Sequence, residues 1–177
     1  MTRFSSLRLV FVAMVAVHMV ALGIQVIRED ELAENPLGLR VERLASGRSE
    51  SLAQIAGERP LLVVFWTTWC EYCAEELEGG ADLAERLSAG SAPVEVLFVN
   101  VREHESTVTS HPVTENLTSL IGLDRTGGVA RAFGVRGYPS RVLLGSHGEV
   151  LWFAEGLGAS IEHEVSTRVG GERRDVE

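Results

Sequence analysis

Two runs of apolar residues constrain the fold of this chain more than any other feature of its sequence. Residues 61–66, LLVVFW, have no polar face, and residues 94–101, VEVLFVNV, are almost as apolar, which is typical of strands buried on both sides of a sheet. Residues 73–90, between them, carry apolar side chains near helical spacing, although Gly79 and Gly80 are expected to weaken or bend that helix. The order strand, helix, strand predicts a βαβ unit with a parallel pair.

The segments around this unit have their own patterns. Residues 39–52 alternate around a Ser-Gly turn and predict a small hairpin. Residues 102–119 leave two alternatives open, a crossover helix broken by its proline or an irregular excursion. Further on, we expect a short helix capped near Gly134, an antiparallel hairpin over residues 136–156, and an amphipathic helix over about 159–169.

The N-terminal segment has a different composition. Residues 9–27 form a run of 19 residues without a charge, preceded by two arginines and followed by acidic residues. At a rise of about 1.5 Å per residue, a helix of this length nearly spans a hydrocarbon core of roughly 30 Å. The charge pattern predicts a cytoplasmic N-terminus and an exported domain. A cleaved signal peptide, with its apolar core over residues 9–20 and a small-residue site at 21–23, is the alternative, and it also exports the domain.

We therefore divide the chain into four parts. Residues 1–27 are the expected membrane anchor, 28–38 an acidic spacer, 39–170 a folded domain and 171–177 a polar tail. The formal net charge of −9 repels phosphate backbones, so we expect no nucleic-acid partner.

The chain contains only two cysteines, Cys70 and Cys73. A structural zinc site needs four ligands, and none of the five histidines forms a closely spaced pair, so we expect no metal site. A structural disulfide suits an oxidising compartment, but a bridge that closes so short a loop restrains the unfolded chain little. A redox-active pair is the third interpretation, and it explains the position of the pair between a strand and a helix.

The two cysteines are expected to play different roles. Cys70 lies where the buried strand ends and the helix begins, and there the unpaired backbone N–H groups and the helix dipole favour a thiolate. Cys70 is therefore the predicted nucleophile, and Cys73, in the first turn and more buried, is the predicted resolving thiol. Glu71 opposes the dipole and favours a higher Cys70 pKa and a more reducing couple. The alternative is that Glu71 simply complements the start of the helix.

The segment FWTTWCEYC, the βαβ unit after it and the later GVRGYPSRVLL together resemble the thioredoxin superfamily. Within it, the chain is similar to the membrane-anchored TlpA/ResA/CcmG-type thiol-disulfide oxidoreductases of bacteria. The resemblance implies an α/β fold over residues 39–170, in which helices flank a central mixed sheet extended by an N-terminal hairpin, after an N-terminal transmembrane helix. It also implies that Cys70 attacks, that Cys73 resolves and that Pro139 is the cis-proline beside their disulfide.

Further site residues follow from the same resemblance. Glu76 occupies the position of a glutamate in ResA-like proteins, and we hypothesise that it transfers protons to and from Cys73, with water as the alternative. The residues expected to contact a docked substrate lie around the cysteines and the proline. They are Trp69, Glu71, Tyr72, Gly137, Tyr138 and Pro139. The chain departs from the family pattern at Ala74 and Glu78, where a basic residue and a proline are common.

The favoured function is an exported, membrane-tethered oxidoreductase that reduces protein disulfides, with apocytochrome c as one candidate substrate. Its expected location is the inner membrane, crossed once, with the redox domain on the periplasmic side. Its expected partners are protein thiols and disulfides and a membrane electron-donor protein. We expect no cofactor and a monomeric chain.

Two other functions stay open at this point. Thr67 lies three residues before Cys70, as in thiol peroxidases, but Val63 occupies the position of the proline that such sites require. A non-catalytic binding module is the second, in which Trp69, Tyr72 and Tyr138 form an apolar docking surface and the disulfide only holds its shape.

Overall fold

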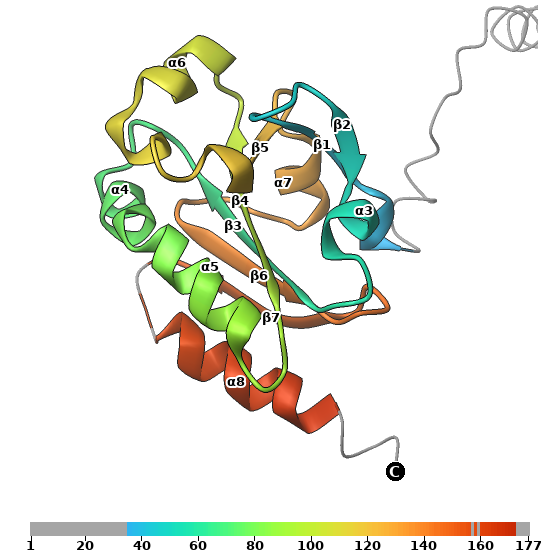
Figure 1. Ribbon diagram of the computed structural model, residues 1–177. Helices are drawn as coiled ribbons and strands as arrows, with labels where there is room; N and C mark the ends of the chain where they lie inside the picture. Colours follow the sequence, from blue (N-terminus) through green and yellow to red (C-terminus); the bar gives the residue numbers. More distant parts are fainter. Residues whose placement is uncertain (1–34, 157, 159, 173–177) are drawn as a thin grey trace, which may run out of the picture. The chain divides into compact units, whose positions relative to one another are not determined.

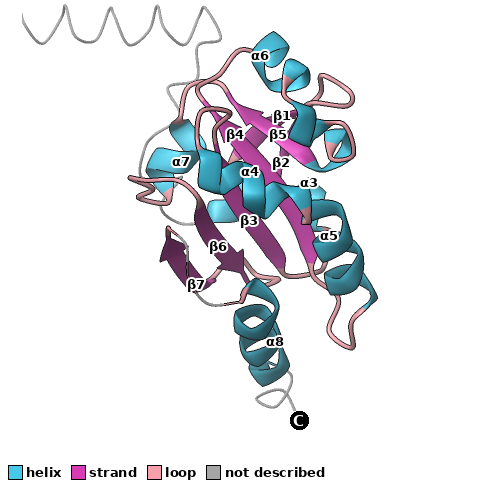
Figure 2. Ribbon diagram, turned by 90° about the vertical axis from the view of Figure 1, so that its left-hand side faces the viewer, coloured by secondary structure: helices cyan, strands magenta, loops and turns pink. Residues whose placement is uncertain are grey.

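A seven-stranded sheet forms the centre of the protein in this computed structural model, which describes residues 35–156, 158 and 160–172. The spatial order of the strands is β2-β1-β5-β4-β3-β6-β7. In chain order the strands are β1 (Arg40–Arg43), β2 (Ser49–Ser51), β3 (Leu61–Trp66), β4 (Glu95–Val101), β5 (Ile121–Asp124), β6 (Ser140–Leu144) and β7 (Val150–Glu155). Figure 2 shows β3 in the middle, between β4 and β6.

The sheet is mixed, as expected. β3 pairs in parallel with β4, with Leu62 opposite Val96, and β4 pairs in parallel with β5. β6 runs antiparallel to both β3 and β7. All six residues of β3 are buried, because helices cover both faces of the sheet there. The predicted parallel pair and the closing hairpin are both confirmed.

Helices lie on both faces of the sheet (Figure 1). On one face, α4 (Glu71–Glu78), α5 (Gly80–Ala89) and α8 (Ile161–Glu172) pack on alternate side chains of β3, including Leu62 and Val64. The other face carries α3 (Leu52–Ala56) and α7 (Gly128–Ala132). The expected bend at the glycine pair is confirmed, since α4 ends at Glu78 and α5 begins at Gly80.

The N-terminal hairpin and the two helices predicted in the C-terminal half also agree with the structure. β1 and β2 pair antiparallel, and β1 continues the sheet by pairing antiparallel with β5. α7 is followed by Gly134 with a positive φ of 71°, which is the conformation that glycine favours after a helix. The last helix, α8, begins two residues later than expected.

Residues 102–119 contain elements of both alternatives. A short helix, α6 (Glu105–Ser110), ends before Pro112, because proline disfavours helical backbone in the residue that precedes it. Two 3₁₀ turns follow, η2 (Pro112–Thr114) and η3 (Thr118–Leu120). The strand β5 that comes next was not predicted from the sequence, since it is only four residues long and contains a glycine and an aspartate.

The predicted membrane anchor and most of the acidic spacer lie outside the described residues. The end of the spacer forms the 3₁₀ turn η1 (Pro36–Gly38), in which Leu37 is buried. Within the part of the chain that the structure describes, no helix has both the length and the apolar character needed to cross a membrane.

The Gly79–Gly80 pair gives a matched test of the packing between α5 and the sheet. A Cβ added at Gly80 would lie 2.8 Å from Cζ of the fully buried Phe98, whereas one added at Gly79 would meet nothing within 4 Å. We expect Gly80→Ala to lower the free energy of unfolding by about 1–3 kcal/mol through overpacking. Gly79→Ala should change it by less than about 1 kcal/mol. Urea unfolding measures both, and equal losses would contradict the packing described here.

Candidate functional site

Cys70 joins β3 to α4. It has extended backbone angles, caps the N-terminus of α4, and its Sγ accepts the Cys73 N–H at 3.2 Å. Cys70 and Cys73 form a disulfide with their Cα atoms 5.2 Å apart. Cys73 is completely buried, whereas Cys70 keeps 7% of its surface exposed. Cys73 is therefore the more buried of the two residues, as the sequence predicted.

The loop before Cys70 is held by a carboxylate that the sequence analysis did not single out. Glu103 accepts the backbone N–H of Thr68 at 2.7 Å and also bonds the Thr68 hydroxyl. Its second contact is the side-chain amide of Asn100 on β4, at 2.7 Å. Glu103 is therefore a positioning residue for the start of the redox segment. The available signal was the cluster of polar residues that follows β4, because sites in such sheets gather at the carboxyl ends of parallel strands.

The aromatic residues expected to contact substrate surround the disulfide. Trp69 and Tyr72 are the most exposed large apolar side chains among the described residues, at 70% and 57%. The ring of Trp69 lies edge-on to that of Tyr138, with 5.8 Å between the centroids. Burial raises the pKa of the Tyr138 phenol above its ordinary value, and the charge of Arg102 partly offsets that rise. The structure thus brings together two segments about seventy residues apart in the chain.

The Tyr138-Pro139 peptide bond is cis, as the resemblance implied. Pro139 is buried and begins the approach to β6, and its carbonyl accepts the N–H of Gly156 at 2.8 Å. The carbonyl of Gly137 accepts the Ser140 hydroxyl at 2.7 Å. Gly137 is thereby bonded to the first residue of β6, and Pro139 to the residue that follows β7.

Glu76 lies on α4 and forms an ion pair with Arg141 of β6. The guanidinium donates to both carboxylate oxygens, with 2.7 Å between Nε and Oε1, and a third donor contacts the Gly156 carbonyl. Both side chains are largely buried, with 10% of Glu76 and 5% of Arg141 exposed. Sequence reasoning did not identify Arg141 as the partner, since the two residues lie 65 positions apart. Glu71, one turn earlier, is exposed.

Comparison with known proteins gives a consistent result. The sequence pattern of the AhpC/TSA family matches residues 39–153. The thioredoxin-like protein YneN of Bacillus subtilis is 30% identical over 105 residues, which cover 59% of this chain and 61% of YneN. The thiol-disulfide oxidoreductase ResA of Halalkalibacterium halodurans is 31% identical over 106 residues, which cover 59% of this chain and 58% of ResA. The chain therefore matches about three fifths of the length of these relatives.

A solved structure supports the fold. The solution structure of a putative thioredoxin from Neisseria meningitidis superposes with a TM-score of 0.64 and is 22% identical. The superposition covers 81% of this chain and 94% of that one. At this identity the likeness concerns the fold, which is thioredoxin-like.

The Glu76–Arg141 pair predicts a particular pattern of stability. Glu76→Ala leaves a buried guanidinium without its counter-charge and should lower the free energy of unfolding by about 3 kcal/mol or more. The double change Glu76→Leu with Arg141→Met removes both charges and should be more stable than Glu76→Ala. Glu75→Ala, an exposed change on the same helix, is the control. The account of a buried pair fails if Glu76→Ala costs no more than Glu75→Ala in urea unfolding.

Proposed function

This chain belongs to the AhpC/TSA family of thioredoxin-like proteins, and we propose that it is a thiol-disulfide oxidoreductase that reduces disulfides in protein substrates. The observation that carries the proposal is the Cys70–Cys73 pair at the β3–α4 junction, with Cys70 7% exposed and Cys73 completely buried. A disulfide with a purely structural role gains nothing from that asymmetry. A disulfide that exchanges with a partner requires it.

The proposed reaction has two steps. The Cys70 thiolate attacks one sulfur of the substrate disulfide, so that an intermolecular disulfide forms and the other substrate sulfur leaves as a thiolate and takes up a proton. The Cys73 thiol then gives up its proton and attacks the Cys70 sulfur. The Cys70–Cys73 disulfide forms, and the second substrate thiol leaves. Two electrons pass from the protein to the substrate. The Cys73 thiol releases one proton, the solvent supplies the other, and both substrate sulfurs end as thiols.

The charges around Cys70 favour a couple that reduces its substrate. The N–H groups at the start of α4 stabilise a thiolate, while the carboxylate of Glu71, the next residue, opposes a second negative charge. Since the reduced form of a strongly oxidising pair is stabilised by a low thiol pKa, a carboxylate here weakens that stabilisation. We therefore assign the pair to the reducing end of the range.

The substrate polypeptide is proposed to dock on the aromatic surface beside the disulfide. Trp69 and Tyr72 offer exposed apolar area before and after Cys70. Tyr138 contacts Trp69, and the Gly137–Pro139 segment presents its backbone edge to an extended chain. This surface explains why the aromatic side chains are left uncovered.

The proton transfer proposed for Glu76 has a structural requirement. Its carboxylate is engaged by Arg141, so it must leave the guanidinium, or pass the proton through water, to serve Cys73.

The location and the partners belong to the same proposal. The uncharged run over residues 9–27 supports a membrane anchor with the redox domain exported. An exported reductant has no access to cytosolic thiols and needs a membrane protein that supplies electrons. Apocytochrome c, whose cysteines must be reduced before haem attaches, is a candidate substrate.

The peroxidase alternative has less support in the geometry. Thr67 is buried with its hydroxyl unpartnered among the described residues. Val63, at the position where a peroxidase site needs proline, is a paired residue in the middle of β3. A regular strand, β3, therefore occupies the position at which a peroxidase site needs its proline.

The test uses the full-length reduced protein with a protein disulfide as substrate. We expect wild type to reduce it, Cys73→Ser to accumulate the mixed disulfide, and Cys70→Ser to form none, because only the resolving step is lost in the first variant. Non-reducing electrophoresis and mass spectrometry measure the adduct. Peroxide consumption that survives Cys73→Ser would favour a peroxidase instead. Full cellular function of Cys70→Ser would favour a binding module.

A further inference from the structure

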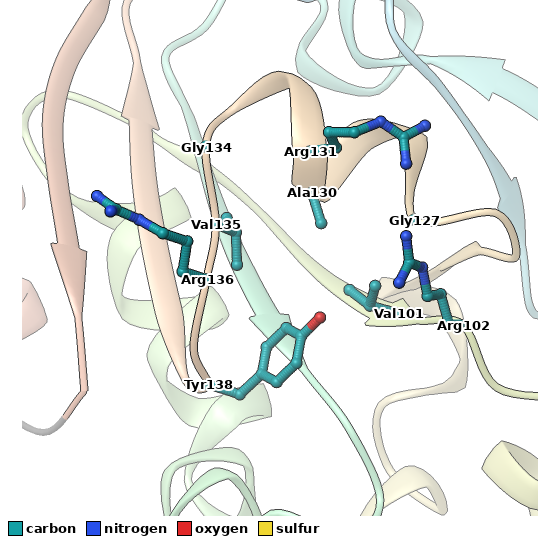
Figure 3. A pocket seen from close by; sticks show the side chains of 9 residues that line it. All are labelled: Val101, Arg102, Gly127, Ala130, Arg131, Gly134, Val135, Arg136 and Tyr138. Atoms are coloured by element: carbon teal, nitrogen blue, oxygen red, sulfur yellow. The ribbon is translucent and has the colours of Figure 1, made fainter.

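A pocket of about 420 Å³ lies next to the redox site (Figure 3). It is formed where β4 ends, along α7, and along the chain that leads to the cis-proline. Three arginines are among its lining residues, Arg102, Arg131 and Arg136, and Tyr138 completes one wall. The hydroxyl of Tyr138 points into the pocket.

The three arginines are exposed, and no carboxylate pairs with any of them within the described residues. Arg102 and Arg131 lie on one side, from the end of β4 and from α7, while the guanidinium of Arg136 is directed away from them on the other side. This concentration of positive charge contrasts with the formal net charge of −9. The carboxylates of Asp124 and Glu103 lie near the same Tyr138 side chain, but neither forms an ion pair with the three arginines within the described residues.

Three carboxylates near the pocket accept hydrogen bonds from backbone or neutral side-chain groups. Glu155 accepts the backbone N–H of Arg136 at 2.8 Å. Asp124 accepts the backbone N–H groups of Gly128 and Ala130, each at 2.9 Å. Glu103 is held by Thr68 and Asn100. Arg102 donates its Nε to the carbonyl of Thr126 at 3.3 Å. Its two terminal nitrogens and the guanidinium groups of Arg131 and Arg136 have no hydrogen-bond partner among the described residues, so their donors are available for a ligand.

The backbone of Arg102 points to a specific role for its side chain. Its φ of 60° makes it the one non-glycine residue with positive φ among those described, in a conformation that glycine or asparagine adopts more readily. The side chain then passes directly over Gly127, where an added Cβ would lie 2.3 Å from Nε. Because strained residues concentrate at ligand-binding sites, the conformation supports a binding function for this guanidinium.

The pocket is continuous with the proposed substrate surface. Tyr138 lines the pocket, precedes Pro139, and contacts Trp69, the neighbour of Cys70. A polypeptide whose cysteine reaches Cys70 across Tyr138 has its neighbouring side chains beside the arginines. This path from Cys70 to the pocket suits a ligand that is part of the substrate polypeptide.

We propose that the pocket binds an acidic side chain of the substrate polypeptide, aspartate or glutamate, placed a few residues from the substrate cysteine. The inference rests on the proposed reductase function and specifies which polypeptides it prefers. Arg102 and Arg131 bind the carboxylate, and Arg136 attracts further acidic residues from the opposite rim. The site selects acidic substrates on a protein whose net charge alone would repel them.

The test compares three peptide disulfides of equal length in which aspartate, asparagine or lysine flanks the cysteine. Reduced full-length protein is mixed with each, and the second-order rate constant is measured. We expect the aspartate peptide to react roughly fivefold faster than the asparagine peptide, which matches a few exposed charge pairs. About 0.5 M salt should remove most of the preference. Repulsion by the net charge predicts the opposite order, so the sign of the difference decides.

Two variants locate the effect. Arg102→Gly removes a guanidinium at a position whose backbone suits glycine, and Arg131→Ala removes an exposed one. Both should bring the ratio of the aspartate and asparagine rates close to one. Arg48→Ala, an exposed arginine in the β1–β2 turn outside the pocket, should leave the ratio unchanged.

The outcomes separate this inference from the function on which it rests. Failure to reduce any peptide or protein disulfide contradicts the proposed function. Equal reduction of the three peptides, or a preference that survives both pocket variants, overturns the acidic-substrate site and leaves the function intact. Glutathione disulfide, a small carboxylate-bearing disulfide, is the further probe. If Arg102→Gly and Arg131→Ala slow only the reduction of glutathione disulfide and not that of the aspartate peptide, the ligand is a free small molecule and the proposal is wrong.

Discussion

The contact between the Cys70 sulfur and the first turn of α4 is the interaction on which the site depends. The apolar strand β3 must end at Trp66, and the helix must begin at Glu71, so Cys70 is the residue that caps it. A sulfur at this position accepts the N–H of Cys73, in the first turn of the helix, at 3.2 Å. The same helix turn buries Cys73, and the two thiols of one short motif thereby become chemically different.

Side-chain contacts between distant elements keep this junction in place. Glu103, after β4, holds the backbone at Thr68, and Arg141, on β6, holds Glu76 on α4. The cis-proline segment meets the junction through the contact of Tyr138 with Trp69. The disulfide site is therefore held in place by residues from both neighbours of β3 in the sheet, β4 and β6.

Patterns carried by neighbouring residues were predictable from the sequence, and pairings across the sheet were not. The continuous apolar run of β3 defined that strand to the residue, and the Gly79–Gly80 pair located the break between α4 and α5. β5 escaped prediction, because its four residues are strand-like only through their partners in β1 and β4. The Arg141 contact with Glu76 escaped for the same reason, since it joins residues far apart in the chain.

The direction of electron transfer proposed for this protein depends on the balance of charges at Cys70, because the helix N-terminus favours the thiolate and Glu71 opposes it. The most direct test of that balance is the reduction potential of the Cys70–Cys73 couple in the purified protein, obtained by equilibration with redox buffers. A reducing enzyme should give a value near that of thioredoxin, about −270 mV. A value near about −120 mV, typical of a dedicated disulfide-forming enzyme, would contradict the reductive assignment.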